Sequence, residues 1–199
     1  QNILYYLSTI FKKHPDLKFP LYVDSPLTTE VTKLYERFDD YHKLTAKDFA
    51  RIHRDTFFIE FKSQRDSIEK NPEPKIILSA SGMMTGGLVP HYLNVLAPNK
   101  NNILMVVGYQ AEGTLGREIV DGLRDIFVEG KAVTWQGSVH ISSAFSSHAD
   151  QAELLSWLNS HADVKQVFLV HGEEESLKIM QQKIGERAMI VEENKTYPI

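Results

Sequence analysis

From residue 76 onward, short apolar runs alternate with longer segments whose apolar residues recur at helical spacing. Neighbouring parallel strands need a crossover between them, and a helix is the usual crossover. This alternation therefore predicts an α/β protein with a mostly parallel sheet and helices on both of its faces. The expected strands are residues 76–78, 103–107, 131–134, 138–142, 167–170 and 189–191, and the expected helices are about 87–96, 114–121, 150–158 and 173–186.

The first 70 residues carry weaker signals of the same kind. Apolar residues at helical spacing predict a helix over 2–11, and Pro15 closes it. A short strand over 21–23 runs into Asp24-Ser25-Pro26, an N-cap followed by proline at the first helical position, so a helix begins there. The residues expected to form a buried patch between 46 and 70 are Phe57, Phe58, Ile59 and Phe61.

Composition excludes several classes of protein. The 199 residues are 42% hydrophobic and 24% charged, which is a globular composition. There is no cysteine, which excludes a thiolate zinc site, a cysteine nucleophile and a disulfide scaffold and is consistent with a cytoplasmic protein. No apolar run reaches the roughly 18 residues of a membrane span. The net charge is −4, but residues 138–199 hold 5 basic and 9 acidic side chains, so the excess lies there and a basic groove earlier in the chain remains compatible.

Two glycine-rich loops follow expected strands, at the edge where open α/β sheets bind ligands. In the first, Ser81, Gly82 and Thr85 are small or hydroxyl-bearing, so backbone amides and a helix N-terminus can face an anion such as phosphate. A tight turn with glycines for close packing explains the same residues equally well. The spacing matches neither a Walker loop nor a dinucleotide-binding motif.

The second glycine-rich loop contains Gly113 and Thr114 and ends at Arg117, in the first turn of the following helix. The Arg117 guanidinium is a candidate phosphate ligand, and pairing with Glu112 or Asp121 is the simpler alternative.

Two histidines follow the next strands along the chain. His148 lies in a serine-flanked loop, and His171 comes directly off an apolar strand, so both are expected at one edge of the sheet. Imidazole at such a place can ligate zinc, or donate to a phosphate oxygen and move protons. Two histidines do not complete a zinc site, which needs three or four protein ligands.

Taken together, the four loops resemble the β-CASP group of metallo-β-lactamase-fold nucleases, which includes ribonuclease J and the endonuclease subunit of the pre-mRNA 3′-end cleavage machinery. The resemblance implies that His148 lies at the scissile phosphate and assists proton transfer, that His171 is a zinc ligand and that Ser146 contacts phosphate. A histidine at the position of His171 is similar to the RNA-processing branch. The matching motifs are Ser81-Gly82-Met83-Met84-Thr85-Gly86-Gly87, Gly108-Tyr109 with Glu112-Gly113-Thr114-Leu115-Gly116, Phe145-Ser146-Ser147-His148-Ala149-Asp150 and Leu169-Val170-His171-Gly172-Glu173.

One motif of that group is absent from this sequence, the upstream H-x-H-x-D-H that supplies most zinc ligands. The resemblance therefore implies a fragment of a nuclease: residues 1–137 as a β-CASP domain lacking its start, and 138–199 as the segment that returns to complete a metallo-β-lactamase fold. The full-length enzyme is expected to hold two zinc ions and to clamp single-stranded RNA. This chain alone is expected to be inactive and to hold no tightly bound zinc.

Two other functions are compatible with the same residues. One is a non-catalytic member of the same family that binds RNA or serves as a scaffold. The other is an unrelated α/β enzyme that acts on a phosphorylated small molecule. Endonuclease or exonuclease action stays open, and a homo-oligomer is compatible with the sequence.

Overall fold

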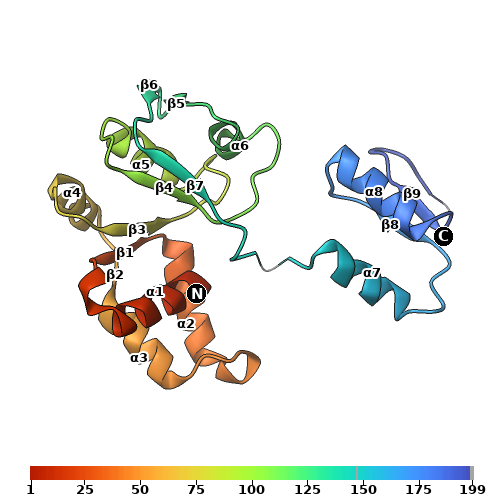
Figure 1. Cartoon of the computed structure of the whole chain (residues 1–199), viewed down its shortest axis with the longest axis horizontal. Helices are drawn as coiled ribbons and strands as arrows, with labels where there is room; N and C mark the ends of the chain where they lie inside the picture. The colour runs from red at the N-terminus through yellow and green to blue at the C-terminus, as the bar shows by residue number, and fades with distance from the viewer. Residues whose placement is uncertain (147, 198–199) are drawn as a thin grey trace. The chain divides into compact units, whose positions relative to one another are not determined.

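The computed structural model describes residues 1–146 and 148–197, which fall into two compact units that divide between residues 146 and 147. Figure 1 shows their elements, and each unit is described by itself. Three of the four sheets in the described chain are parallel, and one is an antiparallel hairpin. None of the described helices combines the length and apolarity needed to cross a membrane.

The first half of unit 1 is built around a three-stranded parallel sheet in which β1 lies between β2 and β3. Helices α1 and α3 pack against each other, and their apolar side chains meet the β1 residues Leu21 and Val23 in one core. Local capping defines where two of the helices begin: Ser25 caps α2, and Thr45 forms a capping box at α3. The elements are α1 (Asn2–Lys13), a 3-10 turn (Pro15–Leu17), β1 (Leu21–Asp24), α2 (Pro26–Arg37), a second 3-10 turn (Asp39–Tyr41), α3 (Ala46–Asp55), β2 (Thr56–Phe58), α4 (Lys62–Lys70) and β3 (Ile76–Ser79).

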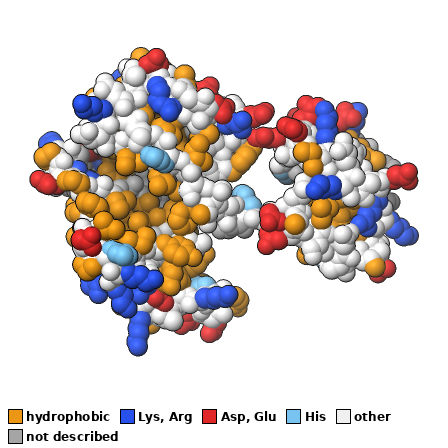
Figure 2. All heavy atoms as spheres, in the orientation of Figure 1, with side chains coloured by type: hydrophobic (Ala, Val, Ile, Leu, Met, Phe, Trp, Pro, Cys, Tyr) orange, Lys and Arg blue, Asp and Glu red, His pale blue; other side chains and the backbone are white. Residues whose placement is uncertain are grey.

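The second half of unit 1 has its own core, which includes Leu93, Val106, Ile119 and Trp135. Strands β4 and β7 pair in parallel, and β5 and β6 form the hairpin. Figure 2 shows hydrophobic side chains over much of the visible face of residues 1–146. The elements are α5 (Val89–Leu96), β4 (Ile103–Val106), α6 (Leu115–Val120), β5 (Asp125–Val128), β6 (Lys131–Thr134) and β7 (Ser138–Ile141).

Unit 2 is a small β/α segment. Its strands β8 and β9 pair in parallel, and α8, which connects them, packs on β9. Asp150 and Glu153 form a reciprocal capping box at the start of α7. The elements are α7 (Gln151–Asn159), β8 (Val167–Leu169), α8 (Glu174–Ile184) and β9 (Ala188–Ile190).

The structure confirms the expected mixed α/β fold with mostly parallel strands, and it corrects three details. The strands form four small sheets, and β2 and β5 were not expected. Glu129 and Gly130 join β5 to β6 with φ of 50° and 75°, a two-residue turn of the hairpin type that lacks the usual Asn-Gly signal. The expected buried patch is partly wrong, because Phe57 is 57% exposed and Phe61 is 64% exposed. Successive strand residues face opposite sides, so Phe58 faces the core while Phe57 faces away.

Candidate functional site

The loop after β3 is folded on itself. The Leu88 amide donates to the Ala80 carbonyl at 2.9 Å, and the Ser81 amide and hydroxyl both approach the Gly86 carbonyl, at 3.2 and 3.3 Å. Met84, at the tip of this loop, is 4% exposed and packs into the second core of unit 1. The loop that carries Ser81, Gly82 and Thr85 is therefore a fixed structure with a buried anchor, as an anion-binding loop and a structural turn both require.

Gly87 is the position in this loop where a side chain does not fit. Its φ is +65°, and a Cβ there would lie 2.2 Å from the Ala80 carbonyl oxygen. We expect Gly87→Ala to destabilise unit 1 by about 1–3 kcal/mol, because the backbone must move or hold a strained conformation. The neighbouring Gly86→Ala is the matched control, since a Cβ there has no atom within 4 Å. Urea unfolding of both variants measures the difference, and equal stabilities would contradict the close approach.

The loop after β4 leads into α6 and carries the second set of predicted phosphate-binding residues, Gly113, Thr114 and Arg117. The Thr114 hydroxyl accepts from the Arg117 amide at 3.3 Å and donates to the Ala111 carbonyl at 2.6 Å, so Thr114 is the helix cap. Gly113 precedes it with φ of 74°. The Arg117 Nε donates to the Asp121 carboxylate at 2.8 Å, one of the two partners that the sequence offered as alternatives to phosphate. This ion pair is solvent-exposed, so it contributes little and an arriving phosphate can compete with it.

The structure brings these two loops together. The Gln110 amide Nε2 donates to the Gly82 carbonyl at 2.8 Å, and the Gly116 backbone amide donates to the Met83 carbonyl at 3.2 Å. The loop after β7, which leads to Ser146, begins beside β4, because the Ser142 amide donates to the carbonyl of Val106 at the end of that strand. The two glycine-rich loops were expected at one sheet edge, whereas β3 and β4 belong to separate sheets and the loops meet through the hydrogen bonds from Gln110 and Gly116. No signal in the sequence pointed to the role of Gln110.

A buried ionic cluster at the end of β1 was also missed. The Asp24 carboxylate is 1% exposed and accepts from the Arg65 Nη2 at 2.9 Å and from the Tyr92 hydroxyl at 2.6 Å. The Ser79 hydroxyl donates to the Asp24 carbonyl, which places the cluster beside the start of the loop after β3. Its three side chains join β1, α4 and α5. One signal in the sequence could have found it: Asp24 ends an apolar strand, and because Ser25 already caps the next helix, the Asp24 carboxylate is left for another role.

The charges in this cluster shift the acidities of its members. Burial raises the pKa of Asp24, but the hydrogen bonds from Arg65 and Tyr92 and the Arg65 charge outweigh it, so the pKa of Asp24 lies below its usual range. Burial and the bond to the Asp24 carboxylate raise the pKa of Tyr92. Asp24 is therefore a permanently charged structural group at neutral pH, which argues against a role as a general acid or base.

The predicted histidines lie outside unit 1. His171 follows β8 with φ of 60°, and His148 precedes the cap of α7; both are exposed. Strand β7 pairs with β4 in unit 1 and β8 pairs with β9 in unit 2, and the shared sheet edge expected for the two histidines stays a prediction. Ser146 ends unit 1, where its amide donates to the Ser143 carbonyl, and Ser147 lies outside the described residues. The predicted roles of Ser146, His148 and His171 stay predictions.

The residues present do not complete a metal site. Within residues 1–146 and 148–197, no group of three or more histidine, aspartate or glutamate side chains is placed to hold a metal ion. A protein zinc site needs three or four ligands. Among the described residues, His171 therefore lacks the further ligands that a zinc site requires.

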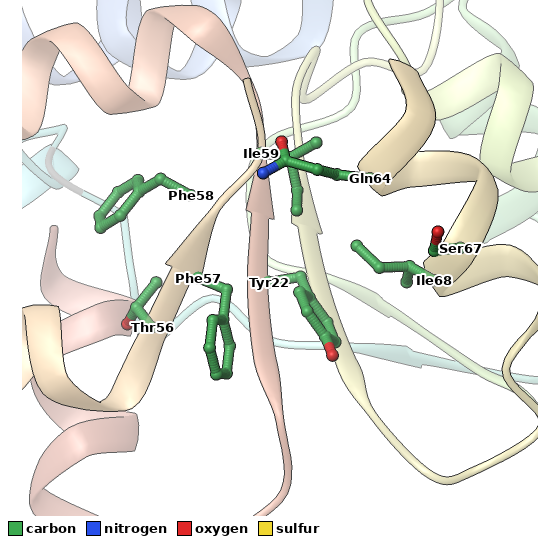
Figure 3. A pocket seen from close by; sticks show the side chains of 8 residues that line it. All are labelled: Tyr22, Thr56, Phe57, Phe58, Ile59, Gln64, Ser67 and Ile68. Atoms are coloured by element: carbon green, nitrogen blue, oxygen red, sulfur yellow. The ribbon is translucent and has the colours of Figure 1, made fainter. Parts of the chain in front are cut away.

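One open pocket of about 460 Å³ lies against β1, β2 and α4. Figure 3 shows Tyr22 and Phe57 along it, with Ile68 and Ser67 coming from the helix. No carboxylate, histidine, lysine or arginine is among the described residues that line it, and neither glycine-rich loop reaches it. The polar side-chain groups of the described lining residues are therefore hydroxyls and one amide, with no charged group to bind phosphate.

The small parallel sheets and the two linked glycine-rich loops define an α/β protein with ligand-binding loops after its strands, and comparison with known proteins makes this class specific. The sequence model described as the Beta-Casp domain matches residues 1–119, and the one described as the Zn-dependent metallo-hydrolase RNA specificity domain matches residues 136–193. The chain therefore belongs to the β-CASP family of metallo-hydrolase RNA nucleases. This confirms the resemblance seen in the four loops.

Individual relatives agree with the family. The chain is 35% identical to Ribonuclease TTHA0252 of Thermus thermophilus over 89% of its own length and 41% of the relative. It is 32% identical to the RNase J-like protein of Methanocaldococcus jannaschii, over 87% of the chain and 40% of the relative. It is also 32% identical to the transcription termination factor FttA of Thermococcus kodakarensis, over 79% of the chain and 26% of the relative. The chain thus spans less than half the length of each of these relatives.

Proposed function

We propose that the whole protein containing this chain hydrolyses phosphodiester bonds of RNA in a zinc-dependent reaction, and that residues 1–137 clamp single-stranded RNA. The observation that carries the proposal is the order of the two family matches, a β-CASP domain followed by an RNA specificity domain, in a chain 35% identical to a ribonuclease. The paired loops of unit 1 support it, since they join Ser81, Gly82 and Thr85 to the loop of Gly113, Thr114 and Arg117.

Within this proposal, the residues of the chain have distinct roles. The two loops of unit 1 bind the RNA backbone through amides, hydroxyls and Arg117. Ser146 contacts phosphate, and His148 moves a proton at the scissile phosphate. His171 supplies one zinc ligand, and residues 138–199 complete the domain that holds the metal.

The test of the proposed function uses the whole protein. It should cleave a labelled single-stranded RNA, lose activity on treatment with a chelator and regain it with added zinc. RNA binding without cleavage in the zinc-loaded protein would favour the scaffold function instead. Tight binding of mononucleotides with no dependence on RNA length would favour an enzyme of small phosphorylated molecules.

The role of Arg117 can be measured on this chain. Each cation that neutralises a phosphate adds about 0.7 to the slope of log affinity against log salt for single strands. We therefore expect Arg117→Ala to flatten that slope by about this amount, and Asp121→Asn to strengthen binding by removing the competing carboxylate. Lys131→Ala, on the hairpin, is the control for loss of one charge. Titration of labelled RNA at several salt concentrations gives the slopes, and an unchanged slope for Arg117→Ala would remove this residue from the RNA path.

A further inference from the structure

Gln110 holds an unusual position between the two loops of unit 1. Its side chain is 6% exposed, and its Nε2 donates both to the Gly82 carbonyl at 2.8 Å and to the Gly108 carbonyl at 3.1 Å. Gly82 belongs to the loop after β3 and Gly108 to the loop after β4. One side-chain amide therefore uses its two hydrogens to join both loops.

The oxygen atom of the same side-chain amide lowers the stability of the folded chain. Among the described residues, the Gln110 Oε1 is buried and has no hydrogen-bond partner. A buried acceptor without a partner costs free energy, whereas methionine would fill similar space without that cost. This cost offsets the stability that the two donated hydrogen bonds contribute, so a net gain in stability does not by itself explain a glutamine at this position. What glutamine supplies, and methionine does not, is the pair of donated hydrogen bonds between the loops.

The local packing leaves the amide little freedom. A Cβ built on Gly116 would lie 1.7 Å from the Gln110 Oε1, so α6 reaches this close only because residue 116 is glycine. The Gly116 amide in turn donates to the Met83 carbonyl, a second link between the same loops. Gln110 and Gly116 thus form one contact that fixes the loop of Gly82 against the start of α6.

We propose that Gln110 is a positioning residue for RNA binding: it holds the loops after β3 and β4 in the single arrangement in which both meet the RNA backbone. The inference rests on the proposed function, because it takes these loops as the RNA contact. Gln110 itself is buried and touches no RNA. Its effect passes through Gly82, Gly108 and the start of α6.

The experiment compares Gln110→Met with Asn102→Leu in the full 199-residue chain. Asn102 also donates a side-chain amide to a backbone carbonyl, that of Leu96, but it lies away from the loops. Affinity for a labelled oligouridine at low salt should fall about 3- to 30-fold in Gln110→Met, the range for substitutions that act through coupling, and stay unchanged in Asn102→Leu. The melting temperature of Gln110→Met should stay close to that of the wild-type chain, because removal of the buried, unpartnered oxygen offsets the loss of the two donated hydrogen bonds.

A second substitution reaches the same contact from the other side. Gly116→Ala displaces the Gln110 amide, so it should weaken RNA binding to a similar extent, and the double variant with Gln110→Met should be no weaker than either single variant. Amide hydrogen exchange provides a readout without RNA. The Gly116 amide should lose protection in Gln110→Met, while the Ile76 amide, which donates to the Pro20 carbonyl, should keep it.

The possible results separate the two proposals. A wild-type chain that binds no RNA contradicts the proposed role of these loops and, with it, the RNA role of Gln110. Wild-type binding that is unchanged in Gln110→Met overturns the inference about Gln110 alone. Unchanged protection of the Gly116 amide overturns it as well, because the loops then hold their arrangement without the glutamine. Weaker binding with lower protection of that amide and a melting temperature close to that of the wild-type chain supports it.

Discussion

Asp24→Ala is expected to destabilise unit 1 by about 3–5 kcal/mol, the cost of removing one partner from a buried ion pair. The substitution leaves the Arg65 guanidinium, which is 19% exposed, and the buried Tyr92 hydroxyl without their shared acceptor. It also removes the link between β1 and the helices α4 and α5. Replacing both charges together, as Asp24→Leu with Arg65→Met, should recover much of the loss, because apolar residues leave no unpaired charge behind.

The measurement can be confined to unit 1 because the chain has two tryptophans. Trp135 is 4% exposed in the core of unit 1, and Trp157 is 65% exposed on α7. In a Trp157→Phe background, tryptophan fluorescence during urea unfolding therefore reports on unit 1. Asp66→Ala is the matched control, because Asp66 pairs with Lys62 on the solvent-exposed side of α4 and its loss should have a much smaller effect. Equal effects of the two substitutions would contradict the structural role of the Asp24 cluster.

The same cluster sets the direction of a pH dependence. The pKa of Asp24 is lower in the folded chain than its ordinary value of 3.8. The stabilisation from the cluster is therefore fully present above about pH 4, and it is lost as the pH falls through the lowered, folded-state pKa. Below pH 4 the stability of the wild-type chain should fall more steeply than that of Asp24→Ala, which has already lost this contribution.

The cluster also shows which parts of the structure the sequence could predict. Helix α1, strands β3 and β4 and the elements of unit 2 are recognisable because their apolar spacing, caps and breaks lie within a few residues of one another. Arg65 lies 41 residues from Asp24 and Tyr92 lies 68 residues away. Contacts at such separations depend on how the strands are ordered in the sheets, and no local pattern encodes that order.

In the candidate site, too, the residues with a local sequence signal could be predicted, and those that depend on distant contacts could not. The glycines, hydroxyls and Arg117 of the two loops stood out because small residues after a strand are a local signal. Gln110 did not, since its role depends on the Gly82 carbonyl, 28 residues earlier. The shared edge expected for the histidines rests on the same kind of information, because it assumes an order of strands that no local pattern encodes; within their own units, β7 pairs with β4 and β8 pairs with β9.

The second large effect is expected for the two histidines, and it requires the whole protein. His171 lies two residues after the end of strand β8, where a side chain can meet a metal held by other ligands, whereas His148 lies in a serine-flanked loop before the cap of α7. Loss of a metal ligand lowers metal content as well as rate, while loss of a proton-transfer group lowers the rate alone, typically 10²–10⁴-fold. His148→Ala should therefore keep its zinc and lose cleavage, and His171→Ala should lose both, for at least one metal position.

Zinc content and single-turnover RNA cleavage, measured on the same preparations, separate the two roles. His161→Ala is the control, because His161 is an exposed histidine of the same unit whose ring contacts the Trp157 carbonyl at the end of α7; both its zinc content and its rate should match the wild-type protein. If His148→Ala loses metal while His171→Ala keeps it, the assigned roles are reversed. If neither substitution slows cleavage, the reaction does not use these side chains, and the proposed mechanism fails even though the chain remains a β-CASP protein by sequence and fold.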